Sequence, residues 1–335
     1  MQRIPSLTKI KLNREWVIFS LIYFSLSFSA LVLKTHQTPG WYNGTLVSNH
    51  QQLLAFQYVN NEQSRLLQFL VPEFFHRLLG IQIENAYALA RLLFVFLAFI
   101  CFHIFLRKWF SQAESLAGVL ILWGALPIAF QSPDLQESAP LLMLMFILCL
   151  WAIRENKDVL FGIFLFIGGG LTNETLLAIA AGYFFVNIRS FKVRDLINSG
   201  LKTVLFSFPA YLAQGIIRYF TIDQPHLGGA FHLPGNLNGI WYELTHPVTA
   251  LYTGLYIYLL VVFSIFWLLP LIGYKRSPQF LQRMFWVTPL FLVAHLITGI
   301  IYEVRQMIPL GFILIPMSLF LIFPKTNPDV EVGCK

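Results

Sequence analysis

Residues 86–106 read AYALARLLFVFLAFICFHIFL, an apolar run that contains a single arginine. A helix of about 20 apolar residues is long enough to cross the hydrocarbon core of a bilayer. Backbone amides cannot stay unpaired in hydrocarbon, so only helices and closed barrels span it. Because the apolar residues here are continuous rather than alternating, the stretch predicts a transmembrane α-helix.

The composition of the whole chain agrees with this prediction. Hydrophobic residues make up 57% of the 335 residues and charged residues only 12%, and the mean hydropathy is +0.66. These apolar residues are too abundant for one water-soluble core to bury. We expect an all-α fold, a polytopic integral membrane bundle that forms a single transmembrane domain over residues 1–335.

Further apolar runs predict about ten membrane-spanning helices. They lie at about 16–33, 86–106, 114–130, 139–153, 159–171, 174–188, 200–219, 249–273, 284–301 and 306–323. With the N-terminus on the cytoplasmic side, 17 of the 23 Lys and Arg residues fall in cytoplasmic segments, in keeping with the positive-inside tendency. We therefore expect both termini in the cytoplasm and the chain in the plasma or inner membrane.

The stretch from Asp158 to Ile188 is either one long helix or two short ones that turn at GGGLTNET (168–175). One span would invert the topology of the basic segments that follow, so the charge pattern favours a hairpin. A helix of about 14 residues rises only roughly 21 Å, less than a hydrocarbon core of about 30 Å. The turn therefore either lies in a recess lined by polar residues or forms a shallow external turn, unless a tilt of the helices makes up the length.

Two external segments are long, at about 35–85 and about 220–248, and a short cytoplasmic tail follows at about 324–335. In the first segment, which we call loop 1, leucines and phenylalanines recur at roughly helical spacing on both sides of Pro72. Proline interrupts helices, so the pattern predicts two short amphipathic helices. We expect them to lie at the outer membrane interface.

Charged side chains are costly in a membrane, so those at the external end of the bundle are candidates for function. They are Glu62, Arg65, Glu73, Arg77, Glu84, Asp134, Glu137, Glu174, Asp223, Glu243, Glu303 and Arg305. The expected topology places all of them on one side, which favours a shared extracytoplasmic site. There, a carboxylate could take a proton from an acceptor hydroxyl while arginines hold a phosphate leaving group.

The same residues argue against other classes of function. The net charge is +7, but the basic residues form short clusters between apolar runs, so no nucleic acid is expected as a partner. Cys101, Cys149 and Cys334 lack paired spacing, and the histidines form no HExxH motif. No metal site is predicted, and the cofactor is unknown, a divalent metal being one possibility.

The layout resembles the type C glycosyltransferase superfamily, multi-pass enzymes that use polyprenyl-phosphate-linked sugars on the extracytoplasmic face. The shared features are a basic N-terminus before the first span, SRLLQFLVP (64–72) in loop 1, Asp134 in SPDLQESAPLLMLMFILCL (132–150), GGGLTNETLLAIA (168–180), and EVRQMIPL (303–310) before the final span. One departure concerns THQTPGWYNGTLVSNHQQ (35–52), which lacks the acidic residue that these enzymes usually carry soon after the first span.

The resemblance implies a cell-envelope transferase that moves a hexose or pentose from a polyprenyl-phosphate donor to an extracytoplasmic acceptor. Asp134, Glu62 and Glu174 would be its catalytic carboxylates, with Asp134 or Glu62 as the base or metal anchor. Arg65 and Arg305 would contact the phosphate. Two further carboxylates would line the site, Glu137 and Glu303.

Two other functions are compatible with the sequence. One is a transporter or lipid flippase, in which the interrupted hairpin would form a discontinuous binding element. The other is a non-catalytic membrane assembly subunit. The expected partners are a lipid-linked sugar donor and membrane lipid, and the sequence identifies no protein partner.

Overall fold

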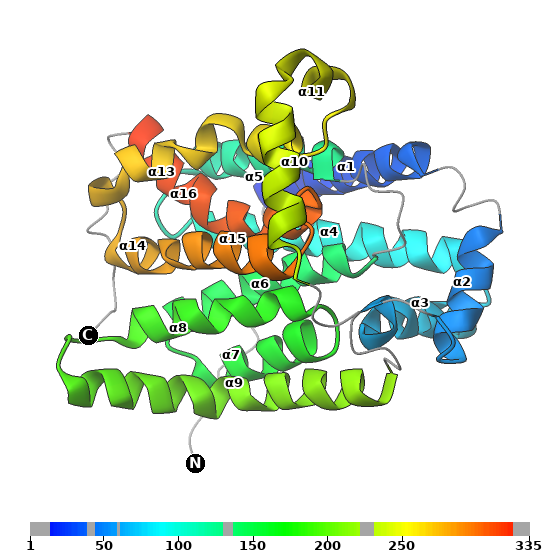
Figure 1. The fold of residues 1–335 in the computed structure, drawn as a ribbon, viewed down its shortest axis with the longest axis horizontal. Helices are drawn as coiled ribbons and strands as arrows, with labels where there is room; N and C mark the ends of the chain where they lie inside the picture. The colour runs from blue at the N-terminus through cyan, green and yellow to red at the C-terminus, as the bar shows by residue number, and fades with distance from the viewer. Residues whose placement is uncertain (1–13, 39–43, 59–60, 130–136, 222–230, 324–335) are drawn as a thin grey trace.

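The computed structural model describes residues 14–38, 44–58, 61–129, 137–221 and 231–323, and every regular element in these ranges is helical. Figure 1 shows most of the longer helices running in roughly the same direction, with α10 (Leu233–Thr245) crossing them. The chain therefore has the all-α fold that its apolar runs predict.

Five helical segments are long and apolar enough to cross a membrane. They are α1 (Arg14–Gln37), α4 (Ile83–Leu106), α5 (Gln112–Ala129), α14 with α15 (Gln279–Phe285 and Val287–Thr298), and η8 with α16 (Val304–Leu310 and Gly311–Ile322). The protein is an α-helical membrane protein. The prediction of about ten spanning helices is wrong, because only these five described segments have the length and composition required.

Four of the other predicted spans are helical but too short or too polar. Three are apolar but shorter than 18 residues, namely α6 (Ser138–Arg154), α7 with the π-helical turn η3 (Asp158–Leu165 and Phe166–Gly170), and η4 with α8 (Glu174–Ala178 and Ile179–Asn187). The fourth, α9 (Val193–Thr221), has 29 residues but includes Lys202, Gln214 and Arg218.

The fifth, predicted at 249–273, is broken into short pieces. They are α11 (Pro247–Thr253), α12 (Ile257–Val261), η6 (Ser264–Trp267) and α13 (Leu269–Ile272), and η7 (Tyr274–Arg276) follows. Gly254 ends α11 with an extended backbone, and the Glu243 carboxylate accepts hydrogen bonds from the N–H groups of Leu255, Tyr256 and Ile257 at 2.6, 2.9 and 2.8 Å. Glu243 therefore satisfies donors that have no partner at the start of a helix, and it stabilises the break.

The predicted hairpin is present as two short helical segments that turn at residues 171–173. Asn173 caps η4, because its side-chain oxygen accepts a hydrogen bond from the Thr175 N–H at 3.0 Å. Its amide nitrogen donates to the Ser138 hydroxyl at 3.0 Å and so ties the turn to α6. Gly168 lets the two arms approach closely, since a Cβ there would lie 2.2 Å from the Leu176 side chain and 2.6 Å from Met145.

Loop 1 contains the two predicted helices, but the break between them is not at Pro72. α2 (Thr45–Leu54) is followed by η2 (Asn61–Ser64) and α3 (Leu66–Leu79), and Pro72 lies buried inside α3. His50 joins the loop to α4 through hydrogen bonds of its ring nitrogens with the Tyr87 hydroxyl at 3.0 Å and with Glu73 at 2.9 Å. Pro72 removes one backbone hydrogen bond from α3, and its buried packing outweighs that loss.

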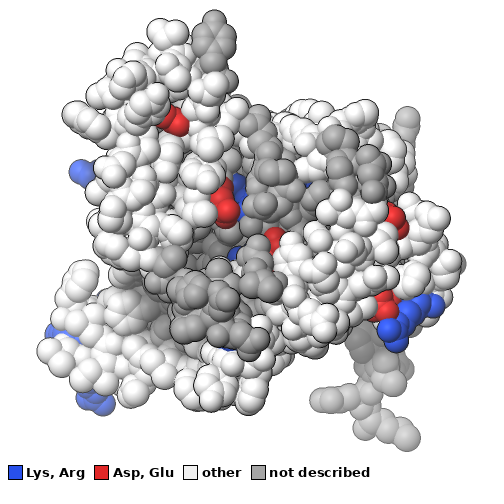
Figure 2. Space-filling view, turned by 45° about the vertical axis from the view of Figure 1, so that its right-hand side comes forward, with Lys and Arg blue, Asp and Glu red and all other residues white. Residues whose placement is uncertain are grey.

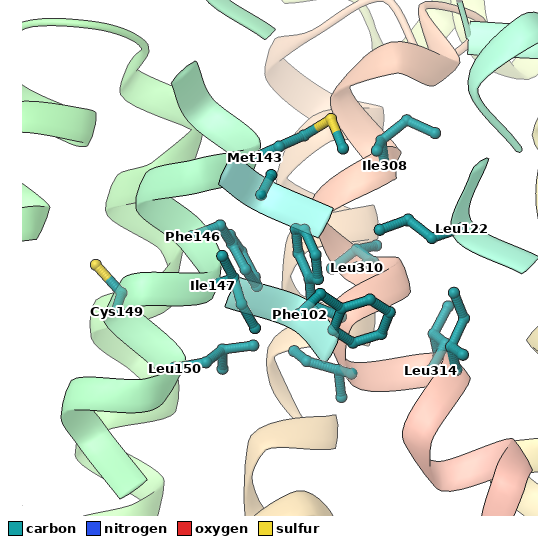
Figure 3. Packing of buried hydrophobic residues seen from close by; sticks show 14 of the residues in the cluster. Phe102, Leu122, Met143, Phe146, Ile147, Cys149, Leu150, Ile308, Leu310 and Leu314 are labelled. Carbon is teal, nitrogen blue, oxygen red and sulfur yellow. The ribbon is translucent and has the colours of Figure 1, made fainter. Parts of the chain in front are cut away.

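The core of the bundle lies around α16, whose residues from Gly311 to Phe320 are all buried. Phe312 packs against Phe102 of α4 and Phe146 of α6, with ring centroids 4.9 and 6.1 Å apart. Figure 3 shows Phe102, Phe146 and the neighbouring leucine and isoleucine side chains converging between these helices. By contrast, α1 is mostly exposed, as expected of a helix that faces lipid.

Candidate functional site

A polar cavity of about 430 Å³ opens among loop 1, the hairpin turn, the start of α10 and the end of α15. Figure 2, which brings the α2–α3 end of the molecule forward, shows a hollow in this face with acidic and basic atoms inside it. The lining residues are Asn61, Arg65, Glu174, Thr175, Ala178, His232, Phe291, Ala294, His295, Thr298, Gly299, Ile300, Glu303 and Gln306.

Glu174 is held by two arginines from different segments. Arg65 donates from Nε and Nη2 to the two carboxylate oxygens at 3.3 and 3.1 Å, and Arg218 of α9 donates to Oε1 at 2.9 Å. Burial acts to lower the pKa of Arg65, but the charge and hydrogen bonds of Glu174 outweigh it and raise that pKa. This cluster therefore joins loop 1, the hairpin and α9 through charged groups at the cavity wall.

Three buried polar atoms of cavity-lining residues have no hydrogen-bond partner among the described residues. They are Nη1 of Arg65, Oδ1 of Asn61 and Nε2 of His295. Buried polar groups are normally paired, so each of these atoms has bonding capacity that the described chain does not use. Together they offer one donor, one acceptor, and one ring nitrogen that can serve as either.

Glu303 and Gln306 line a further part of the cavity. Arg305 and Glu303 pair at 2.9 Å, because Glu303 precedes η8 and is not constrained by helical spacing. Gln306 accepts a hydrogen bond from the Thr175 hydroxyl at 2.8 Å, which connects η8 to the hairpin. Two charges that lie two residues apart in the sequence are therefore paired at this part of the cavity.

His295 lies in the last turn of α15, where its ring stacks on Phe291 with centroids 5.8 Å apart and planes 11° apart. Gly299 ends the helix, and a Cβ on it would lie 2.5 Å from the imidazole. Asn236 of α10 donates to the carbonyls of Leu296 and Gly299, both at 2.8 Å. The start of α10 and the end of α15 therefore form one rigid wall.

Most of the predicted site residues lie at the cavity or directly beside it. Arg65, Glu174 and Glu303 line the cavity, and Arg305 is paired to Glu303. Glu62 is buried beside Arg65 and accepts a hydrogen bond from Gln68 at 3.3 Å, but it is not among the lining residues.

The structure places one further predicted carboxylate, Glu137, away from this cavity. Glu137 pairs with Arg91 beside a separate, much smaller cavity between α3, α4 and α6, and it does not line the larger cavity. Asp134 lies outside the described residues. Sequence reasoning also missed cavity groups from other segments, namely Asn61, Arg218, His232 and His295, for which the only signal was a polar residue at or near an apolar run.

The described side chains favour anion binding over metal binding at this site. Among them, no group of three or more His, Cys, Asp or Glu residues is close enough to hold a metal ion. A guanidinium with a remaining N–H group can bind a phosphate through charge-assisted hydrogen bonds. Comparison with known protein families, curated proteins and solved structures gave no significant match.

Proposed function

We propose that this protein is a membrane glycosyltransferase that moves a sugar from a polyprenyl-phosphate donor to an acceptor at the extracytoplasmic face. The proposal rests on the layout that resembles the type C glycosyltransferase superfamily and on the chemistry of the cavity. Its termini would lie in the cytoplasm and its cavity would open on the opposite side. The donor and the surrounding lipid would be its partners.

The observation that carries the proposal is the buried guanidinium of Arg65. Two of its nitrogens bind Glu174, and Nη1 has no partner among the described residues although the residue is only 5% exposed. A phosphate oxygen that accepts from Nη1 would satisfy this donor and gain a charge-assisted hydrogen bond. The leaving phosphate would therefore be held by Arg65, while Glu174 fixes the orientation of the guanidinium.

Each described carboxylate at the cavity is already ion-paired. Glu174 binds Arg65 and Arg218, and Glu303 binds Arg305. The two arginines stabilise the charged form of Glu174 and make it a weak proton acceptor, and Arg305 occupies the carboxylate of Glu303. We therefore assign Glu174 and Glu303 to positioning the arginines. Asp134, outside the described residues, stays a predicted base.

The test compares donor consumption by the wild type, Arg65→Lys and Arg77→Lys after reconstitution with labelled polyprenyl-phosphate sugars. Lysine keeps the charge at position 65 but not the fork that binds Glu174 and phosphate together. We expect Arg65→Lys to lower kcat/KM for the donor by about 10- to 100-fold, the loss of one charged hydrogen bond. Arg77, whose side chain is 75% exposed on α3, is the matched control and should tolerate the change.

Unchanged kinetics in a folded Arg65→Lys protein would remove Arg65 from donor binding. Loss of consumption in Asp134→Asn, with normal membrane insertion, would assign the base to that residue. Absence of consumption by the folded wild type with every donor supplied would contradict the transferase itself.

A transporter or lipid flippase is the second candidate, and the broken helices favour it. The hairpin changes to a π-helical turn and then a turn of irregular backbone beside a polar cavity, as the discontinuous helices of transporters do. Substrate-dependent flux through reconstituted vesicles, without donor turnover, would support transport over catalysis.

A further inference from the structure

We propose that His295 is the group that takes the proton from the acceptor hydroxyl during sugar transfer. This inference rests on the proposed transferase function. It assigns the base to a residue of α15 in place of Asp134 or Glu62, the two carboxylates that the resemblance implies, and it fits the absence of the usual acidic residue from 35–52.

The first reason is that imidazole is the described cavity group best able to accept a proton. Among the described lining residues, the groups that titrate are Arg65, Glu174, His232, His295 and Glu303. Arg65 carries its proton at all ordinary pH values, and the two carboxylates are held in ion pairs. Protonation of either carboxylate would break its pair, whereas a neutral imidazole has a free lone pair.

The second reason is that the ring of His295 is held in place. Phe291 stacks on one side of it, and Gly299 provides the space for it at the end of α15. Nε2 is buried and has no hydrogen-bond partner among the described residues. A fixed ring with an unused nitrogen has the properties of a positioned base, because proton transfer requires hydrogen-bond reach in a defined direction.

The third reason is that charged groups from several segments, including the proposed phosphate site, surround the ring in one cavity. Glu174 and Glu303 come from the hairpin and from the segment after α15, Arg65 from loop 1, Arg305 from η8, and the second imidazole, His232, from the start of α10. The phosphate site proposed at Arg65 and the proton acceptor at His295 belong to the same cavity. An acceptor hydroxyl between them could reach both the sugar and Nε2.

The step balances without any further reactant. The acceptor oxygen forms a bond to the anomeric carbon of the donor, and the bond from that carbon to the phosphate oxygen breaks. The phosphate leaves with the electron pair toward Arg65, and the hydroxyl proton passes to Nε2 of His295. The imidazolium then gives the proton to the phosphate product, which restores the neutral ring.

The experiment measures donor consumption by reconstituted wild type, His295→Gln, His295→Ala and His232→Gln across pH. We expect His295→Gln to lower kcat by about 100-fold or more, the usual contribution of a general base, with a smaller change in KM. Wild-type kcat should rise with pH as an imidazole loses its proton, and His295→Gln should lose this rise. Added imidazole should restore turnover to His295→Ala, where the ring leaves a space, but not to His295→Gln.

Gly299→Ala tests the placement of the ring without removing it, because the added methyl would displace the imidazole. Gly215→Ala is its control, since a Cβ at Gly215 in α9 meets nothing within 4 Å. We expect a loss of kcat only in the first. Wild-type rates in His295→Ala, or a loss in that variant that imidazole does not restore, would overturn the role of His295 while leaving the transferase in place. Absence of turnover by the folded wild type would instead overturn the transferase, and the role of His295 with it.

Discussion

At the scale of single residues, neighbouring side chains compensate the buried charge of Arg65 and fix the orientation of its guanidinium. Moving a guanidinium out of water is unfavourable, and the loss is offset only by well-placed opposite charge. Glu174 supplies that charge and is itself shared with Arg218. The arginine fork is thereby oriented before any ligand binds, which is the arrangement that gives tight recognition at low entropic cost.

His50 gives the first prediction, a dependence of stability on pH. Burial lowers the pKa of His50 below 6.5, although its hydrogen bond with Glu73 acts to raise it. The folded state thus favours the neutral ring, which donates to the Glu73 carboxylate and accepts from the Tyr87 hydroxyl. The contribution of His50 to the free energy of unfolding is therefore fully present above pH 6.5. It decreases as the pH falls below that value, because the unfolded chain binds the proton more readily.

The measurement is the melting temperature of the purified protein between pH 8 and 5. His50→Gln should flatten the decline, and His246→Gln, a change at an exposed histidine, should keep it. An unchanged pH dependence in His50→Gln would contradict the assignment. Below pH 4.5 a second loss of stability is expected. Burial acts to raise the pKa of Glu73, but its hydrogen bonds with His50 and Arg77 outweigh burial and lower that pKa.

The sequence predicts which residues are candidates for the site better than which partners they have. Arg65, Glu174 and Glu303 are identifiable as charges next to apolar runs, and all three line the cavity. Glu137 meets the same criterion yet pairs with Arg91, because a contact between residues 46 apart depends on how helices pack. His295 has no such signal, since a lone histidine in an apolar run usually fills a packing position.

At the scale of elements, the hairpin depends on Gly168. The second prediction is that Gly168→Ala lowers the melting temperature, because its Cβ would overlap Leu176 and the Met145 side chain and overpacking costs about 1–3 kcal/mol. Gly200→Ala in α9 is the control, since its Cβ meets nothing within 4 Å. That change should be neutral or stabilise by up to about 1 kcal/mol through helix propensity. Equal melting temperatures for the two variants would contradict the close approach.

Helix existence follows from the sequence more reliably than helix length. Apolar runs locate α1, α4, α5, α15 and α16 to within a few residues. The run at 249–273 has the composition of a span, but the distant Glu243 carboxylate caps an internal break in it. Such capping is a tertiary contact, so no local pattern announces it.

At the scale of the whole molecule, the minimum length of a helix depends on whether it contacts lipid or is surrounded by other helices. A helix in contact with lipid must cover the hydrocarbon thickness, whereas a helix surrounded by protein has its ends shielded by neighbours. α1 is 24 residues long and mostly exposed, and the shorter α6 is almost entirely buried. Figure 1 shows α4 and α9 extending further toward the α2–α3 end than α8 and α15 do.

The expected orientation of the protein in the membrane rests on charged residues at the end of the bundle away from the cavity. The turns after α4 and α6 are joined there by Lys108 and Glu155 at 3.2 Å, and Arg154 lies over Trp109 at 4.6 Å. Arg283 of α14 donates to the carbonyl of Val186 at 2.7 Å, which brings the ends of α8 and α14 together. These connections are rich in Lys and Arg, so by the positive-inside tendency we propose that they face the cytoplasm and that the cavity opens on the other side.

The third prediction tests that assignment with single cysteines in a chain whose Cys101, Cys149 and Cys334 have been replaced. A membrane-impermeant maleimide should label Arg77→Cys on α3 in intact cells. It should label Phe191→Cys only after the membrane is permeabilised, because Phe191 is 90% exposed in the turn between α8 and α9. The reverse pattern would place the cavity in the cytoplasm, where a donor and acceptor would have to reach it from the cytoplasmic leaflet, and the extracytoplasmic transferase would then be untenable.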